Sequence, residues 1–273
     1  MAPEVAALEL NHEHLQIKDL KKVYPNGFKA VQGINLKMYK GQIFSLLGHN
    51  GAGKSTTISM LTGLVEKSSG SGQVFGNDIF GEMQEVRKSM GVCPQHDVLF
   101  DLLTPLEHLD IFYDFKGGDP DRKEEEIKSL IYDVGVEPDK LKPAGSLSGG
   151  NRRKLSVSIA LCANSKFVLL DEPTAGMDLQ ARRNIWEMLK NYKNDRIILL
   201  TTHYMDEADV LGDRIGIMAK GRVVSLGSSI FLKNRYGAGY KLTMVKKYKK
   251  KNKKIQPYLE SFFGELEKLT EVS

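Results

Sequence analysis

Short apolar runs, separated by polar or glycine-containing turns, predict a fold in which strands and helices alternate. The predicted strands cover residues 15–23, 29–39, 42–47, 73–75, 90–93, 167–170, 197–200, 214–218 and 222–225. The runs at 167–170 and 197–200 are apolar throughout, which is typical of central strands in a parallel sheet. Helical spacing predicts helices over 54–64, 81–88 and 179–192. This alternation favours an α/β fold.

In the middle of the chain, strands give way to a series of helical segments. Apolar residues recur at helical spacing over 106–115 and again over 124–134, with a Gly-Gly-Asp-Pro turn between them. A further helix is predicted to open at 147–151 and to run through Ala163. We therefore expect an all-helical insertion over about residues 96–155.

A glycine-rich loop follows the apolar run at 42–47. Its eight residues, Gly48, His49, Asn50, Gly51, Ala52, Gly53, Lys54 and Ser55, match the pattern G-x-x-x-x-G-K-[ST], and Thr56 continues into the predicted helix. Main-chain N–H groups and the positive end of the helix favour phosphate at such a loop. We expect Lys54 to contact the β- and γ-phosphates and the Ser55 hydroxyl to ligate Mg²⁺. The strand–loop–helix context disfavours a chance glycine turn.

The apolar strand at 167–170 is followed by two acidic residues, Asp171 and Glu172. Ligands of parallel α/β sheets bind at the carboxyl ends of the strands, so we expect both residues beside the phosphate loop. Asp171 is the candidate for holding Mg²⁺ through its water shell. Glu172 is the candidate for orienting, or accepting a proton from, the water that attacks the γ-phosphate. An isolated Asp-Glu pair is more often part of an exposed helix or turn, and Pro173 favours the site because it ends the strand.

A second candidate anion site opens the helix after residue 147. Ser148, Gly149 and Gly150 stand at its start, where unpaired N–H groups point outward. Because the chain already has one phosphate loop, this second helix start suggests a nucleotide shared between two copies of the chain. The basic residues that follow, 152–154, are expected to form an exposed face of the helix.

In order and spacing, these motifs resemble the nucleotide-binding domain of ATP-binding cassette (ABC) transporters over about residues 13–235. Residues 48–55 resemble Walker A, 167–172 Walker B, 147–151 the signature motif, 93–95 the Q-loop, 175–178 the D-loop and 201–203 the H-loop. The signature departs from the family at Asn151, where glutamine is usual; we expect activity to survive because Ser-Gly-Gly is kept. The resemblance implies an α/β fold: a P-loop NTPase (RecA-like) core, an antiparallel β subdomain, and an all-helical subdomain inserted between Walker A and the signature.

The resemblance also implies ligands, partners and further roles. ATP and Mg²⁺ are the implied ligands; Gln95 senses the γ-phosphate and the metal, His203 positions the attacking water with Glu172, and Tyr24 stacks on the adenine. The implied partner is a second nucleotide-binding domain, head to tail, whose Ser148, Gly149, Gly150 and D-loop Asp178 complete the site. Transmembrane domains are the other implied partner, docking near residues 95–115, and no nucleic acid is expected.

Three stretches, at 45–57, 91–109 and 230–247, look most like the A subfamily of ABC transporters, whose members resemble lipid movers. We therefore expect an ATPase that drives lipid movement from the cytoplasmic face of a membrane. Residues 236–273 are expected to form a basic linker and an incomplete regulatory-domain-like tail, with a strand at 241–245 and a helix at 257–269. On this reading the chain is a fragment, or a product lacking its transmembrane part.

Composition changes this picture little. The 273 residues are 41% hydrophobic and 27% charged, as in ordinary globular proteins. The net charge of +5 depends on seven lysines at 246–254: without them, 32 basic residues face 34 acidic ones, a balance of −2 that does not suggest a nucleic-acid binder. We expect that lysine run to be a solvated linker, with contact to an anionic lipid surface as the alternative. No apolar run reaches the roughly 20 residues that span a bilayer.

The main alternative function is a soluble ABC ATPase that acts on ribosomes or DNA. Chromosome-type members carry a long coiled coil between Walker A and the signature, and this stretch of the sequence shows no heptads. Translation-type members usually carry two cassettes, and this sequence shows one. A GTPase is a weaker alternative, because the sequence has no Asn-Lys-x-Asp motif to recognise guanine.

Overall fold

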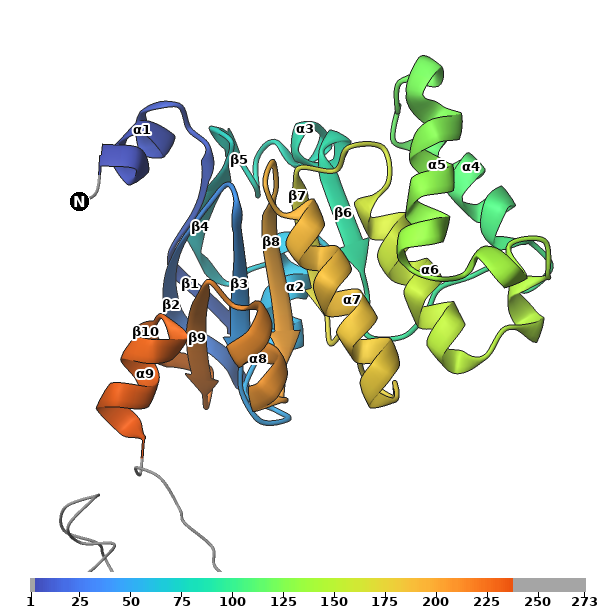
Figure 1. Cartoon of the computed structure of the whole chain (residues 1–273). Helices are drawn as coiled ribbons and strands as arrows, with labels where there is room; N and C mark the ends of the chain where they lie inside the picture. The colour runs from blue at the N-terminus through green and yellow to red at the C-terminus, as the bar shows by residue number, and fades with distance from the viewer. Residues whose placement is uncertain (1–2, 238–273) are drawn as a thin grey trace, which may run out of the picture. The chain divides into compact units, whose positions relative to one another are not determined.

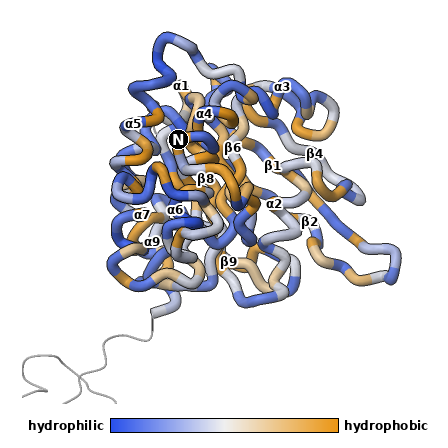
Figure 2. The backbone as a smooth tube through the Cα atoms, turned by 90° about the vertical axis from the view of Figure 1, so that its right-hand side faces the viewer, coloured by the Kyte–Doolittle hydropathy of each residue, from blue (hydrophilic) through white to orange (hydrophobic). Residues whose placement is uncertain are grey.

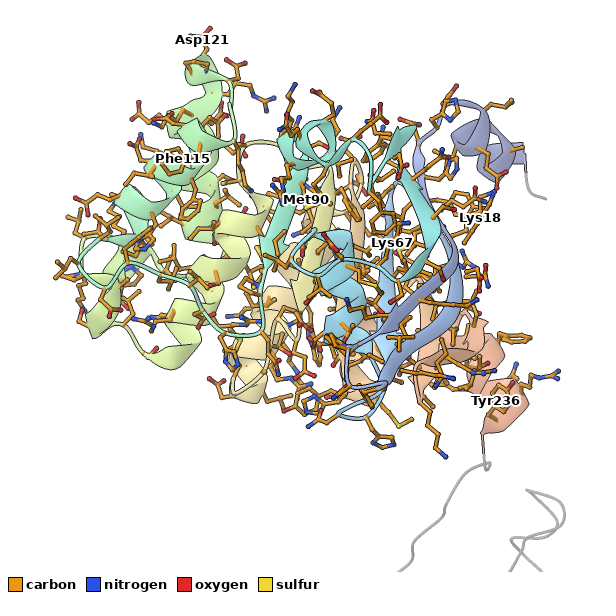
Figure 3. The ribbon with its side chains drawn as sticks, turned by 180° about the vertical axis from the view of Figure 1, so that it is seen from behind. Lys18, Lys67, Met90, Phe115, Asp121 and Tyr236 are labelled. Atoms are coloured by element: carbon orange, nitrogen blue, oxygen red, sulfur yellow. The ribbon has the colours of Figure 1, made fainter. Side chains whose placement is uncertain are left out.

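The computed structural model describes residues 3–237, of which those through Tyr236 belong to one compact unit. Two sheets and a group of helices make up this unit (Figure 1). Figure 3 shows it from behind, with the helical part that carries Phe115 and Asp121 on one side and the sheet that carries Lys18 on the other. No helix in this range is both long enough and apolar enough to cross a bilayer.

The larger sheet has six strands in the order β10-β9-β3-β8-β7-β6. Their bounds are β3 (Gln42–Leu47), β6 (Met90–Cys93), β7 (Phe167–Asp171), β8 (Ile197–Thr202), β9 (Arg214–Ala219) and β10 (Arg222–Gly227). All neighbours pair in parallel except β10, which pairs antiparallel with β9. The arrowheads of β3, β6, β8 and β9 therefore point to one edge, at the lower side of Figure 1. This carboxyl edge is where a parallel sheet places its ligand.

The smaller sheet is antiparallel, in the order β2-β1-β4-β5. Its strands are β1 (His14–Val23), β2 (Lys29–Tyr39), β4 (Ser69–Val74) and β5 (Asn77–Asp78). One face is buried: Leu15, Ile17, Ile34 and Leu36 pack into the same core as α2 (Lys54–Leu61). The antiparallel β subdomain expected from the sequence is thus present.

The helical insertion lies between β6 and β7, as expected. It consists of α4 (Pro105–Phe115), α5 (Lys123–Asp133) and α6 (Gly149–Leu161), with 3-10 turns at 120–122, 137–139 and 144–146. A capping box starts α4: the Glu107 N–H donates to Thr104 Oγ1 at 3.2 Å, and the Thr104 N–H donates to Glu107 Oε2 at 2.7 Å. The remaining helices are α1 (Pro3–Leu10), α3 (Met83–Lys88), α7 (Leu179–Tyr192), α8 (Met205–Leu211) and α9 (Ser229–Tyr236).

The larger sheet separates two hydrophobic cores, because alternate side chains of its strands point to opposite faces. Phe167 and Leu169 join the core shared with α2 and the antiparallel sheet, whereas Val168 and Leu170 join the core shared with the helical insertion and α7. Figure 2 shows the apolar backbone positions gathered along β6 and β8, with hydrophilic segments around them. Both faces of the sheet are therefore buried, as its uninterrupted apolar strands predict.

Several predicted boundaries were wrong. Helix α2 ends at Leu61 rather than residue 64, because Gly63 adopts a left-handed φ of 75° just beyond it. Helix α3 begins at Met83, and α6 ends at Leu161. Strand β4 begins at Ser69, where small polar residues gave no strand pattern. The elements α1, α8, α9 and β5 were not predicted. The strand expected at 241–245, the helix expected at 257–269 and the lysine run at 246–254 lie outside the described residues.

Candidate nucleotide-binding site

The phosphate loop joins β3 to α2 at the carboxyl edge of the larger sheet. Gly53 has a φ of 105°, and a Cβ there would lie 2.5 Å from the carbonyl oxygen of Ala30. Only glycine fits such a left-handed and close-packed position without strain. His49, Asn50 and Gly51 are exposed on the outer side of the loop, while Ala52 is buried. The loop is thus packed on one side and open on the other, as a phosphate cradle requires.

Lys54 is almost completely buried at the start of α2, with 4% of its surface exposed. Its Nζ donates to the carbonyl oxygens of Gly48 at 2.7 Å and His49 at 3.3 Å, and it lies 3.5 Å from Glu172 Oε1. The ammonium group is therefore held inside the curve of the loop. A cation at this place can interact with the oxygens of a bound phosphate chain.

Ser55 and Asp171 meet beside the loop. Ser55 Oγ donates to Asp171 Oδ1 at 3.1 Å, and the hydroxyl of Thr201 on β8 donates to the same oxygen. The hydroxyl and the carboxylate form an oxygen donor pair of the kind that Mg²⁺ prefers. Thr56 follows Ser55 in the first turn of α2 and is half-buried.

A magnesium ion would fit this pair only together with phosphate and water oxygens. Within residues 3–237, no group of three or more His, Cys, Asp or Glu side chains could hold a metal by itself. Mg²⁺ commonly binds through one or two protein groups plus substrate phosphates and waters, and Ser55 with Asp171 matches that mode. Cys93 is fully buried, and this burial raises the pKa of its thiol to about 12.

Glu172 has a strained backbone and a buried side chain. Its φ is 50°, in the left-handed region, which costs a non-glycine residue about 1–3 kcal/mol. Its N–H donates to both the carbonyl oxygen and the hydroxyl of Thr201, each at 3.1 Å. Its Oε2 lies 3.1 Å from Nδ1 of His203, so the two carboxylate oxygens face Lys54 and His203. Residues in such conformations cluster at functional sites.

His203 follows β8 and reaches Glu172 from the solvent side. Its side chain is one-third exposed, whereas that of Glu172 is 9% exposed. The imidazole also lies against the ring of Tyr204, with ring centroids 4.0 Å apart. The arrangement presents an imidazole and a carboxylate, in contact with each other, at the mouth of the site.

Three further predicted site residues have no hydrogen bond or ion pair with these groups among the described residues. Gln95 is exposed just after β6, at the same carboxyl edge. Tyr24 is half-buried at the turn after β1, stacked on Phe28 with centroids 6.4 Å apart. Asp178 caps α7 by accepting hydrogen bonds from the N–H groups of Gln180 and Ala181 at 2.9 and 3.0 Å. These bonds lower the pKa of the Asp178 carboxyl, and the bond from the Ala181 N–H has the largest effect.

The signature residues stand apart from the phosphate loop. Ser148 caps α6, accepting the N–H of Asn151 at 3.2 Å, and a Cβ added to Gly149 or Gly150 would meet no atom within 4 Å. In Figure 1, α6 begins at the lower right, away from α2. No hydrogen bond among the described residues joins 147–151 to the loop. Asn151 donates to Asp139 at 2.7 Å, so its side chain is turned toward its own chain.

One prediction about α6 was wrong: Arg153 and Lys154 are buried, with 4% and 9% of their surfaces exposed. Every residue from Arg153 to Leu161 is buried, because α6 lies between the sheet and the other helices of the insertion. The guanidinium of Arg153 donates to main-chain carbonyls of the Walker B and Q-loop segments. Three consecutive basic residues gave no sign of this burial, and serines at 156 and 158 interrupt the apolar residues that follow.

Comparison with known proteins gives one consistent family. The family model described as ABC transporter matches residues 31–175. Over 235 residues, 85% of this chain, the sequence is 54% identical to the protein of Homo sapiens named Phospholipid-transporting ATPase ABCA3. The chain spans only 14% of the length of that relative.

Solved structures agree on the fold. A structure of an ATP-binding subunit of an ABC transporter matches with a TM-score of 0.75 and 27% identity, covering 82% of this chain and 93% of the other. A dimeric bacterial ABC transporter cassette, MJ0796, matches with a TM-score of 0.72 and 24% identity, covering 79% of this chain and 98% of the other. At that identity, the second match supports the fold alone.

Proposed function

Because this chain belongs to the ABC transporter family and forms an ATP-binding domain of that family, we propose that it hydrolyses ATP in a head-to-tail pair of domains and drives lipid across a membrane. The observation that carries the proposal is the meeting of Lys54, Asp171, Glu172 and His203, from three different elements, at the carboxyl edge of one sheet. This edge holds groups for phosphate binding and for water activation side by side.

The chemistry follows from the positions of these side chains. Lys54 and the N–H groups of the loop bind the phosphates, and Mg²⁺ held beside Ser55 and Asp171 would neutralise charge on the β- and γ-oxygens. Glu172 then orients the attacking water or accepts its proton. His203, in contact with Glu172 Oε2, keeps that carboxylate and the water in line. Gln95, just after β6, would add a side-chain ligand to that metal.

A partner domain supplies what the single chain lacks beside its phosphate loop. The open space in front of Gly149 and Gly150, and the exposed Ser148, allow the signature of one copy to approach the γ-phosphate held by another. The main-chain N–H groups at the start of α6 suit that charge. Asp178 lies in the segment that would face the partner, and Tyr24 would stack on the adenine.

Mixing two inactive variants tests the shared site. Lys54→Ala cannot bind ATP at its own phosphate loop but has an intact signature motif. Ser148→Arg has an intact phosphate loop, but its bulky charge prevents its signature from approaching the partner's ATP. A mixed dimer contains one complete site, so the mixture should recover ATPase activity that rises with total protein concentration. Each variant mixed with itself is the control. No recovery at concentrations where the parent dimerises with ATP would refute the role of Ser148 in the partner's site.

The role of Glu172 has its own test. Glu172→Gln should bind Mg·ATP with parent-like affinity, remain as an ATP-bound dimer, and hydrolyse ATP about 10²–10⁴-fold more slowly, since a general base contributes that much. Calorimetry, size-exclusion chromatography and phosphate release measure the three quantities. Parent-like hydrolysis by this variant would exclude Glu172 as the base.

Lipid transport is proposed from the identity to a phospholipid-transporting relative and from the A-subfamily stretches. The proposal places this domain at the cytoplasmic face of a membrane, joined to membrane-spanning partners. Exchanging residues 13–235 into the matching domain of the human relative should keep phospholipid transport, whereas the same exchange with Glu172→Gln should abolish it. A folded, ATP-hydrolysing chimera without transport would contradict this part of the proposal.

A further inference from the structure

The guanidinium of Arg153 uses every one of its donors. An arginine side chain offers five N–H bonds. Those of Arg153 go to the carbonyl oxygens of Pro173 (3.1 Å), Pro94 (2.5 Å), Asp171 (2.6 Å) and Glu172 (2.9 Å), and to Asp97 Oδ1 (3.0 Å). Four of the five acceptors are main-chain carbonyls, so the group mainly holds the backbone of two separate loops, with one side-chain partner, Asp97.

Two of these bonds enclose the strained residue of the site. The Nη2 atom of Arg153 donates to the carbonyl oxygens of both Asp171 and Glu172, which belong to the peptide planes on either side of Glu172. The orientation of those two planes defines the left-handed backbone of Glu172, whose φ is 50°. On the other side, the Glu172 N–H is held by Thr201. Arg153 and Thr201 thus hold the Glu172 backbone from both sides.

The other end of the guanidinium holds the segment that carries Gln95. Its Nη1 donates to Pro94 O and to Asp97 Oδ1, one residue before and two residues after that glutamine. Asp97 is the one carboxylate within 4.0 Å of Arg153 among the described residues, and its side chain is 19% exposed. A displacement of residues 94–97 would therefore change the hydrogen bonds that hold Glu172.

We propose that Arg153 is a positioning residue: it sets the carboxylate of Glu172 through the main chain and links it to the Q-loop segment at 94–97. The inference rests on the proposed function, since it assigns Arg153 a part in the hydrolysis carried out with Glu172. The positioning role at residue 153 also requires an arginine side chain. A lysine has one nitrogen with three N–H bonds and cannot reach acceptors on both loops in the same planar arrangement.

Arg153→Lys, made in the full chain, tests the proposal. The turnover number should fall about 10- to 100-fold, as for the loss of other groups that orient a reacting side chain, while the dissociation constant of Mg·ATP stays within about twofold. Arg152→Lys is the matched control: Arg152 Nη1 bonds Asp101 and Ala144 O, outside the nucleotide site, and this variant should turn over ATP like the parent. Parent-like turnover by Arg153→Lys would overturn the inference.

A double variant separates positioning from a general loss of folded protein. Because Arg153 acts through Glu172, adding Arg153→Lys to Glu172→Gln should lower the residual single-turnover rate by no more than about twofold. A purely structural defect would lower the rate by the same factor in the parent and in the Glu172→Gln variant. A further 10-fold loss in the double variant would therefore refute the positioning role. If the parent itself does not hydrolyse ATP, or Glu172→Gln hydrolyses it as fast, the proposed function fails instead.

Asp97→Asn provides a test that does not depend on the folding of the arginine variants. It keeps the shape of a partly exposed side chain and removes only the charge that faces Arg153. Turnover should fall by an amount between those of the parent and Arg153→Lys, with Mg·ATP affinity unchanged and no further loss in the Glu172→Gln background. Parent-like turnover would refute the link between the Q-loop segment and Glu172.

Discussion

Replacing Gly150 by alanine should make the chain more stable and less active at once. Gly150 is the second residue of α6, and the Cβ of an alanine there would meet no atom within 4 Å. Its φ is not in the left-handed region, so alanine fits the backbone. Alanine restricts the unfolded chain more than glycine does and is the better helix former, which together favour folding by about 0.4–1 kcal/mol. For a domain of this size, that corresponds to a rise in Tm of about 1–4 °C.

The same methyl group should inhibit hydrolysis. If the N–H groups at the start of α6 approach a phosphate of the partner's ATP to hydrogen-bonding distance, about 2.9 Å, a methyl group on this surface holds the two domains apart. ATPase activity should then fall at least about 10-fold, with the gain in stability unchanged. Binding of Mg·ATP to the variant's own phosphate loop should match the parent, because the loop lies elsewhere in the chain.

Three measurements on one preparation decide the matter: the Tm by scanning calorimetry, the Mg·ATP dissociation constant, and ATPase activity over a range of protein concentrations. Gly149→Ala, which also meets open space, should behave in the same way. Parent-like ATPase activity would show that no phosphate approaches this surface. A lower Tm would show that the space in front of α6 is not open.

Three further substitutions address stability and adenine binding. Gly91→Ala should lower stability by about 3 kcal/mol or more, measured by urea unfolding, because its Cβ would lie 1.7 Å from the carbonyl oxygen of Ala160; a change under 0.5 kcal/mol would contradict this packing. Asp178→Ala should lower Tm at pH 7, because it removes the side chain that caps α7. The pKa of the Asp178 carboxyl is lower in the folded chain than in the unfolded chain, so the ionised cap contributes its full stabilisation above the unfolded-state pKa. That contribution is lost as pH falls through the folded-state pKa, so the Tm difference between the parent and the variant should shrink from about pH 4 downward. A difference that is constant with pH would argue against the cap. Tyr24→Leu should weaken ATP binding about 5- to 100-fold by calorimetry while Tyr24→Phe retains it, and equal affinities would exclude stacking.

The parts of the fold that could be predicted are those whose pattern repeats along the chain. Strands β3 and β6 and helix α7 were predicted with the bounds that the structure shows, because these buried parallel strands are mostly apolar and α7 is amphipathic. Strand β4 begins Ser-Gly-Ser-Gly, a sequence typical of loops. Its glycine at 70 is required by contact, since a Cβ there would lie 2.4 Å from the carbonyl oxygen of Asp19. Such requirements come from the neighbouring strand and leave no local signal.

The sequence pointed to the side chains that meet beside the phosphate loop, but not to the contacts that hold them there. The loop pattern and the acidic end of β7 pointed to Lys54, Ser55, Asp171 and Glu172, and the structure places these side chains together. The left-handed backbone of Glu172 and the buried Arg153 were not predictable. Both depend on contacts between segments far apart in the sequence, and an arginine's need for five buried acceptors cannot be read from its immediate neighbours.

The strand order of the larger sheet also bears on how the chain folds during synthesis. Strand β3, which leads into the phosphate loop, has β8 and β9 as its neighbours, and Gln42 is paired with Ile197. Pairing between such distant segments makes folding slow. A ribosome will therefore have made the loop, the entire helical insertion and the acidic end of β7 before β3 acquires either neighbour. Until then the apolar strand at 42–47 has no sheet to enter, so the nascent chain carries an unpaired, aggregation-prone segment that a chaperone is well placed to cover.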